Sequence, residues 1–105
     1  LREGARVERP WIGIAGRSLT PDLARERGLG VQRGALIQDI VSESPAAAAD
    51  LRPDDVIVAV EGDPLDSWED LLGIVAEREP GQRVRLTVMR RGTRLDLQVT
   101  LGVRP

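Results

Sequence analysis

The apolar residues of the chain recur with two spacings, which predict a mixed fold of short strands and helices. Alternation of apolar with small or polar residues is typical of strands, and apolar residues three and four positions apart are typical of helices. The run at 56–60 is largely β-branched and wholly apolar, as expected of a central strand. Alternating segments predict further strands at residues 11–19, 34–41, 84–90 and 95–101. The last two are separated by Arg91-Gly92-Thr93, which predicts a tight hairpin.

Three helices are predicted from their start signals, each a hydroxyl residue that can cap a helix. Thr20 and Ser44 are each followed by proline, which is favoured at the first helical position, and the helices that they start are short. Ser67 begins the longest helix, with Asp70 three residues on as a weaker form of the capping box.

The order of these elements indicates a protein that is mainly β with α, built as one domain. Strand, short helix, strand, short helix, strand, long helix and two strands follow one another over 105 residues. We expect a small, partly open β-barrel or sandwich of about five to six strands, capped by one long and one or two short helices. With two Trp and no Phe or Tyr, its core must be aliphatic. Residues 10–103 carry this pattern, residues 1–9 are charged and unpatterned like a linker from an upstream domain, and residues 104–105 form a tail.

The composition then removes most kinds of chemistry from consideration. The chain has no Cys and no His, so it cannot supply a thiol nucleophile, a Ser-His-Asp triad or a histidine metal site. Its 15 basic and 17 acidic residues give a net charge of −2, which argues against nucleic acid as a partner. No stretch is long and apolar enough to cross a bilayer. We therefore predict a chain that is not itself an enzyme and that holds no cofactor.

Two local patterns resemble ligand sites but have a simpler interpretation. Gly28, Gly30 and Gly34 resemble a dinucleotide-binding loop, yet they precede a strand instead of joining a strand to a helix. Four acidic residues gather near two turns without the spacing of a calcium loop, namely Asp54, Asp55, Glu61 and Asp63. Because acidic residues are common in turns, we interpret these four as solvated turn residues and predict no metal site.

A glycine in the first predicted strand indicates a binding turn. Gly13 stands between Ile12 and Ile14, where it would let the backbone bend and expose consecutive N–H groups. Such a concavity of amides binds an anion, for instance the terminal carboxylate of a peptide. The strand beyond it could accept a partner strand along an open edge. The alternative is a simple bulge in the strand.

The longest predicted helix has more apolar surface than one buried stripe requires. Spacings of four and three residues place several apolar residues on one face, namely Trp68, Leu72, Val75 and Ala76. Leu71 and Ile74 occupy a neighbouring face. One face could pack on the sheet while the other lines a groove, and the alternative is that the whole wide stripe is core. Gly73 lowers the helix propensity by about 1 kcal/mol relative to Ala, and periodicity gives it no role.

Several motifs, in order, resemble the PDZ domains of the HtrA (Deg) serine proteases. The stretch "WIGI" at 11–14 is similar to their carboxylate-binding loop, with Trp11 in place of the more usual Tyr. It is followed by "SLTPDLARERGL", "GALIQDIVSESPAAAADLRPDDVIVAVEGDPLDSWEDL" and "PGQRVRLTVMRRGTRLDLQVTL", so the resemblance covers residues 9–103. The chain departs from the family at Asp50 and Asp54, where glycine is usual. The first of these positions is expected to need a left-handed backbone, which Asp tolerates better than most residues.

The resemblance implies a permuted PDZ fold with its peptide-binding strand near the N-terminus. Three backbone amides would hold a peptide's terminal carboxylate, those of Ile12, Gly13 and Ile14. The peptide backbone would pair antiparallel with the strand residues Ile14, Ala15, Gly16 and Arg17. A hydrophobic pocket for the last side chain would be lined by Ile12, Ile14, Leu72, Val75 and Ala76. Trp68 would contact the residue two before the end, and Trp11 would also lie near the groove.

The resemblance also implies a function and partners. The chain would bind exposed hydrophobic C-termini of unfolded or misfolded proteins and pass them to, or regulate, an upstream protease domain of the same protein. That parent would be an oligomeric serine endopeptidase, either periplasmic or anchored to a membrane outside the cytoplasm. Two alternatives stay open. One is a PDZ domain of another parent, such as a site-2 protease, a C-terminal processing protease or a secretion component, and the other is a self-assembly or scaffold domain.

Overall fold

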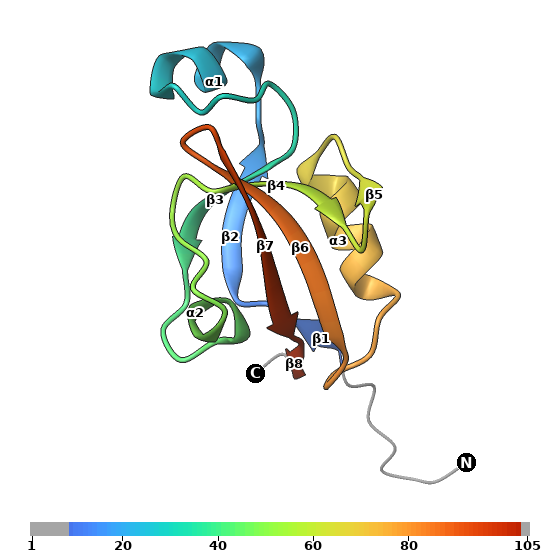
Figure 1. Cartoon of the computed structure of the whole chain (residues 1–105). Helices are drawn as coiled ribbons and strands as arrows, with labels where there is room; N and C mark the ends of the chain where they lie inside the picture. The colour runs from blue at the N-terminus through green and yellow to red at the C-terminus, as the bar shows by residue number, and fades with distance from the viewer. Residues whose placement is uncertain (1–8, 104–105) are drawn as a thin grey trace, which may run out of the picture.

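A computed structural model describes residues 9–103, which form an antiparallel β-structure with three helices at its periphery (Figure 1). The linker predicted at 1–9 and the tail predicted at 104–105 lie outside the described residues, except for Arg9. None of the three helices in the described part is long and apolar enough to cross a bilayer.

The strands form one six-stranded sheet and one separate pair. The strand order of the six-stranded sheet is β2-β3-β4-β6-β7, with β5 paired to β4, and all neighbouring strands are antiparallel. The bounds are β2 (Ile14–Ser18), β3 (Ala35–Ile40), β4 (Val56–Val60), β5 (Asp63–Pro64), β6 (Arg83–Arg90) and β7 (Thr93–Thr100). The separate pair consists of β1 (Pro10–Trp11) and β8 (Gly102–Val103). Because β2 and β7 are its two edges, the sheet does not close into a barrel, as the predicted partly open architecture requires (Figure 1).

Each of the three helices begins at its predicted cap: α1 (Pro21–Arg27), α2 (Pro45–Ala48) and α3 (Trp68–Ala76). The hydroxyl oxygens of Thr20 and Ser44 each accept the N–H of the residue three positions on, at 3.2 Å in both cases. Ser67 accepts the Asp70 N–H at 3.0 Å, and the Asp70 carboxylate accepts the N–H of Asp66 at 3.0 Å. Both halves of a capping box are therefore made in α3, the second one residue earlier than in the usual form. The predicted helix starts are confirmed.

Where β3 pairs with β4 the sheet is buried on both faces, which explains why β4 and the first half of β3 are continuously apolar instead of alternating. Leu36 and Val56 face a small apolar cluster that includes α1, whereas their neighbours Ile37 and Ile57 face the main core with α2 and α3. All four side chains are fully buried. Figure 1 shows α1 at the opposite end of the molecule from α2. The sheet therefore separates two clusters, and α1 covers the smaller one.

The structure corrects the prediction of a single strand at 11–19. The chain pairs at β1 and again at β2, but Ile12 and Gly13 between them belong to neither strand. β1 pairs with β8, at the far end of the described chain. Alternation along the sequence could not reveal this break, because a distant segment makes the pairing that divides the strand.

Positive φ angles occur at the expected turns. Asp50 has a φ of 67° and Asp54 a φ of 73°, so the left-handed backbone expected at Asp50 is confirmed and Asp54 shares it. The turn between β6 and β7 consists of Arg91, with a φ of 50°, and Gly92, with a φ of 83°. Two successive positive φ angles give the turn type whose twist matches the flanking strands. The predicted hairpin is confirmed, with Thr93 already in β7.

Candidate functional site

The turn between β1 and β2 requires glycine at position 13 for two reasons. Gly13 has a φ of 90°, which side chains rarely adopt. A Cβ at this position would also lie 2.3 Å from the Cβ of Ser44, the residue that caps α2. The buried backbone of Gly13 therefore packs directly against the start of α2, and the sharp turn expected at this glycine is present.

The protein binds the carbonyl groups of this turn through hydrogen bonds, which directs the amides of the same peptide groups to the opposite side. The Ile12 C=O accepts the N–H of Ala46 and the Gly13 C=O accepts the N–H of Val41, both at 2.9 Å. In a trans peptide the N–H points opposite to the C=O, so the N–H groups of Gly13 and Ile14 point away from α2 and β3. Within residues 9–103, the N–H groups of Ile12 and Gly13 donate to no protein acceptor. The turn therefore presents successive unpartnered amides, as an anion site requires.

β2 continues from this turn as an edge strand whose outer backbone groups are free to pair. Its ladder with β3 is bracketed by two hydrogen bonds of 2.9 Å, Val41 N–H to Gly13 C=O and Leu19 N–H to Gly34 C=O. In an antiparallel ladder these bonds place every second residue of β2 in a pair that exchanges no hydrogen bonds with β3. Those residues, which direct both N–H and C=O to the free edge, are Ile14, Gly16 and Ser18. β2 therefore offers a short edge to an incoming strand.

α3 is fixed beside β2 by a relay of hydrogen bonds at its first turn. The Trp68 N–H donates to the Ser18 hydroxyl oxygen at 2.8 Å, and this hydroxyl donates to the Glu69 carboxylate at 3.2 Å. The Trp68 ring covers Gly16, because a Cβ at Gly16 would lie 2.8 Å from ring carbon Cζ3. Sequence reasoning missed Ser18 and Glu69. No local pattern pairs a strand hydroxyl with a helix that begins 50 residues later.

Two neighbouring leucines of α3 separate its core face from its exposed face. Leu71 is 1% exposed and belongs to the main core, whereas Leu72 is 52% exposed. Ile14 and Val75 are half-buried and pack against the edge of the main core, and Ala76 is exposed. The interpretation of the whole apolar stripe as core is therefore wrong for Leu72. The residues predicted to line a hydrophobic pocket include both core and exposed surface.

Two other predicted site residues contact the protein itself. Ile12 is 6% exposed and belongs to the main core, so only a small part of it is available to line a pocket. The Trp11 ring lies between Gly13 and Gly102, at 3.3 Å and 3.9 Å from the positions that Cβ atoms would take at these glycines. Trp11 therefore packs on the β1–β8 pair. Its contact with a peptide stays a prediction.

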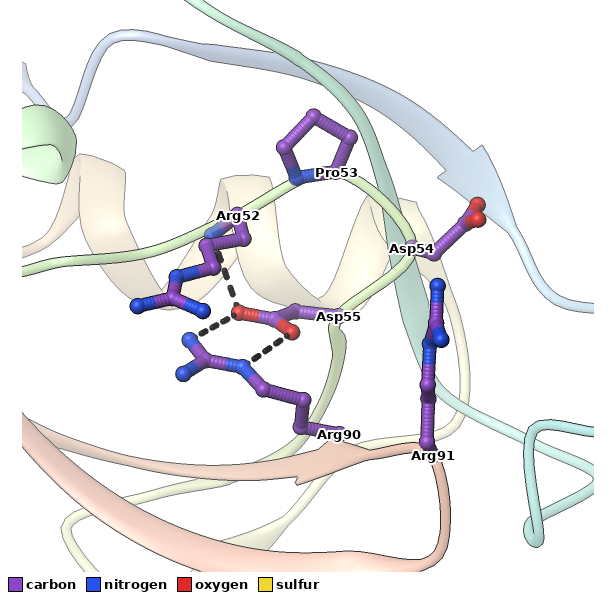
Figure 2. Close-up of a pocket in the computed structure, with 6 residues that line it drawn as sticks. All are labelled: Arg52, Pro53, Asp54, Asp55, Arg90 and Arg91. Atoms are coloured by element: carbon purple, nitrogen blue, oxygen red, sulfur yellow. Dashed lines mark hydrogen bonds and ion pairs between the residues drawn. The ribbon is translucent and has the colours of Figure 1, made fainter.

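A separate cluster of charges surrounds a cavity of about 360 Å³, lined by Arg52, Pro53, Asp54, Asp55, Arg90 and Arg91 (Figure 2). The Asp55 side chain is 1% exposed and accepts two hydrogen bonds from the Arg90 guanidinium, at 2.9 and 2.8 Å. Asp55 also accepts the Arg52 N–H at 2.9 Å, and Arg90 donates to the Asp50 C=O at 2.8 Å. The hydrogen bond from Arg90 to Asp55 raises the pKa of Arg90, against the lowering effect of burial.

This cluster corrects the interpretation of Asp55 as a solvated turn residue. Its carboxylate is buried because Arg90 and a backbone N–H replace water around it, whereas Asp54 is partly exposed and pairs with Arg27 at 2.6 Å. Because the central charges satisfy one another, we assign the cluster the structural task of holding the turn at 50–55 to β6. Among residues 9–103, no group of His, Cys, Asp and Glu side chains is arranged to hold a metal ion.

Comparison with known sequences gives one family and several longer relatives. A family model described as PDZ domain matches residues 10–101. The periplasmic pH-dependent serine endoprotease DegQ of Escherichia coli (strain K12) is 36% identical over 101 residues, which are 96% of this chain and 22% of that protein. The chain therefore spans about a fifth of the length of the curated relatives that it matches.

Two solved structures are similar in fold over nearly the whole chain. The HtrA-type protease AlgW with a decapeptide gives a TM-score of 0.85 at 33% identity, over 94% of this chain and 30% of that one. The HtrA3 PDZ domain bound to a phage-derived ligand (FGRWV) gives a TM-score of 0.80 at 28% identity, over 93% of this chain and 89% of that one. Both similar structures were solved with a peptide.

Proposed function

The chain belongs to the PDZ domain family, and from this membership we propose that it binds hydrophobic C-termini of other polypeptides by strand addition along β2. The observation that carries the proposal is the row of backbone groups directed away from α2 and β3, which runs from the Gly13 and Ile14 amides into β2. A terminal carboxylate supplies the negative charge that these amides require, and a peptide backbone supplies partners for the edge. The peptides in the similar structures support the same class of ligand.

Each part of the site has a separate task in the proposed complex. The amides of Ile12, Gly13 and Ile14 donate to the carboxylate. The peptide backbone pairs with residues 14–17, and among these Ile14 and Gly16 exchange the hydrogen bonds with it. The last side chain of the peptide enters a pocket lined by Ile12, Ile14, Leu72, Val75 and Ala76. Binding then covers the exposed surface of Leu72, which favours association through the hydrophobic effect. Trp68 contacts the residue two before the end.

Amidation of the peptide tests the carboxylate contact directly. A hexapeptide that ends in Val with a free carboxyl group is expected to bind with a Kd of about micromolar order, or about −8 kcal/mol. The C-terminal amide should bind at least about a hundredfold more weakly, because hydrogen bonds to a charged acceptor are lost. Tryptophan fluorescence follows both titrations, since Trp68 covers the groove at Gly16. Equal affinities would overturn the assignment of the carboxylate site.

We further propose that the chain is the substrate-recognition or regulatory domain of an HtrA-like serine endoprotease of the periplasm. The DegQ relative has this location and activity in its name, which supports the proposal. The chain itself lacks His, so the isolated domain should cleave no substrate, whereas the full-length parent should cleave unfolded proteins. Sedimentation of the parent tests the proposed oligomer, and fractionation of the cell distinguishes a free periplasmic protein from an anchored one. The other parents and the scaffold role are not favoured, because the relatives and similar structures named above are HtrA-type proteins.

A further inference from the structure

We propose that Arg17 and Asp39 determine which charged side chains the domain prefers in a bound peptide. With the last residue numbered 0, they favour an acidic residue at position −3 and a basic residue at position −1. The inference rests on the proposed function, because it needs a peptide strand paired with β2. It concerns the exposed face of that strand, away from the proposed carboxylate turn and hydrophobic pocket.

The free backbone groups of β2 determine which peptide residue lies opposite which side chain. If the carboxylate is held at the turn, the Ile14 C=O accepts the N–H of the last residue, and Gly16 pairs with position −2. Position −1 then lies opposite Ala15, and position −3 lies opposite Arg17. Neither of these two residue pairs exchanges hydrogen bonds, because the backbone N–H and C=O groups of Ala15 and Arg17 point to β3 and not to the peptide. Such pairs bring opposing side chains closest, with Cα atoms about 4.5 Å apart.

The burial of β2 shows which face these side chains share. Ile14, Gly16 and Ser18 are half-buried, whereas Ala15 and Arg17 between them are exposed. Because opposing residues in a sheet lie on the same face, the side chains at −1 and −3 point to this exposed face.

Arg17 supplies a positive charge directly opposite position −3. Within the described part of the chain it enters no ion pair, and its guanidinium Nε makes one long hydrogen bond, 3.4 Å to the Ser18 C=O. Opposite charges on facing residues of a sheet attract and like charges repel. Arg17 therefore favours Asp or Glu at −3 and disfavours Lys or Arg.

A bulge in β3 places Asp39 on the same exposed face. Ala15 pairs with Asp39 and Gly16 pairs with Ile37, so Gln38 is an extra residue. Asp39 is exposed and forms no ion pair with any residue in 9–103. Position −1 lies two strand spacings from Asp39, or about 9.6 Å. Lys or Arg can span this distance across the small side chain of Ala15, whereas a short side chain cannot.

The test uses N-acetylated hexapeptides with a free C-terminus, Ac-Ala-Ala-X-Ala-Z-Val, in which X is position −3 and Z is position −1. Calorimetry gives the Kd of peptides with Glu, Ala or Lys at X and Ala at Z, and of peptides with Ala at X and Glu, Ala or Lys at Z. Glu at −3 is expected to bind about fivefold more tightly than Lys, and Lys at −1 about threefold more tightly than Glu. Replacing Lys at −1 by the shorter 2,3-diaminopropionic acid should remove its advantage over Ala.

Charge reversals in the protein assign each preference to one residue. Arg17→Glu is expected to reverse the ratio of affinities at −3 and to leave the ratio at −1 unchanged, and Asp39→Lys should do the opposite. Arg94→Glu is the matched control, because it makes the same change of charge at an exposed position of β7, the other edge of the sheet. The use of ratios within each variant cancels any general loss of affinity or stability.

Failure of this inference is distinguishable from failure of the proposed function. If no peptide binds, or if amidated peptides bind as well as free acids, the proposed function is wrong. If binding depends on the carboxylate but Glu and Lys at −3 bind equally, or the preference survives in Arg17→Glu, the role of Arg17 is overturned. Equal affinity for Lys and Glu at −1, or a preference that survives in Asp39→Lys, overturns the role of Asp39.

Discussion

Gly13 and Gly73 show how differently one residue type can be constrained within the same domain. Gly13 has a φ of 90°, and a side chain there would meet Ser44. Gly73 lies on the exposed side of α3, and nothing lies within 4 Å of the Cβ that it lacks. The first glycine is required by the turn, and the second only weakens its helix.

Gly13→Ala is expected to lower the free energy of unfolding by about 3 kcal/mol. About 1 kcal/mol comes from forcing a side chain into a left-handed backbone, and about 2 kcal/mol from packing a methyl group against Ser44. Urea denaturation measures the loss, and peptide titration should show weaker binding because the amides move. A variant with the stability of the original protein would contradict this account of the turn.

Gly73→Ala is expected to raise the free energy of unfolding by about 0.5–1 kcal/mol, since Ala is the better helix former and space is available. The same denaturation experiment measures it, and it serves as the matched control for Gly13→Ala. A loss of stability would mean that Gly73 has a structural role that its open surroundings do not show.

Arg90→Ala is expected to destabilise the fold by about 3–5 kcal/mol, because it leaves the buried Asp55 carboxylate without its partner. Arg91→Ala is the control, since Arg91 lines the same cavity but is exposed, and it should change stability by less than about 0.5 kcal/mol. In the double variant with Asp55→Ala, the total loss should be smaller than the sum of the single losses. Strict additivity would show that the pair is not coupled.

The raised pKa of Arg90 implies that this effect is independent of pH over the neutral range. A raised pKa in the folded state means that the stabilisation is complete below the ordinary pKa of arginine and is lost only above the raised value. We therefore expect the destabilisation by Arg90→Ala to be the same at about pH 6 and about pH 9. Denaturation at both pH values checks this.

At the level of elements, one hydroxyl group links β2 to α3 through hydrogen bonds, beside the packing of the Trp68 ring on Gly16. Ser18→Ala removes the acceptor of the Trp68 N–H and the donor to Glu69. We expect the free energy of unfolding to fall by about 1–2 kcal/mol. Hydrogen exchange should become faster in the first turn of α3, and this increase should be larger than any increase in β6. Ser42→Ala, at an exposed position between β3 and α2, is the control and should change neither quantity. Unchanged exchange in Ser18→Ala would show that α3 is held by packing alone.

The sequence predicted the elements whose causes are local and missed the relations whose causes are distant. The caps at Ser44 and Ser67 and the hairpin at Arg91–Gly92 depend on residues within four positions, and all three are as predicted. The burial of Asp55 depends on Arg90, 35 residues away, and could not be predicted. Periodicity likewise identified the apolar residues of α3, but it could not show that Leu72 is exposed in the fold.

For the whole molecule, peptide binding and global stability should be linked. A ligand that binds only the folded state at a hundred times its Kd adds about 2.7 kcal/mol to the free energy of unfolding. For a domain of this size we expect a rise in Tm of roughly 10 °C or more with a free-acid peptide. The amidated peptide at the same concentration is the control and should raise the Tm by no more than about 2 °C. A shift of equal size with both peptides would indicate binding elsewhere than the Gly13 turn.

The free edge of β2 also bears on how the protein behaves at high concentration. An unpaired strand edge is a template for intermolecular sheet growth and aggregation. Here the edge strand has only five residues, faces a bulged neighbour, carries the charged Arg17, and has the Trp68 ring packed on one of its faces at Gly16. These features leave room for one short guest strand but not for a long, flat pairing between copies. We therefore expect the domain to keep an unpaired strand edge open to peptides without forming fibrils at high concentration.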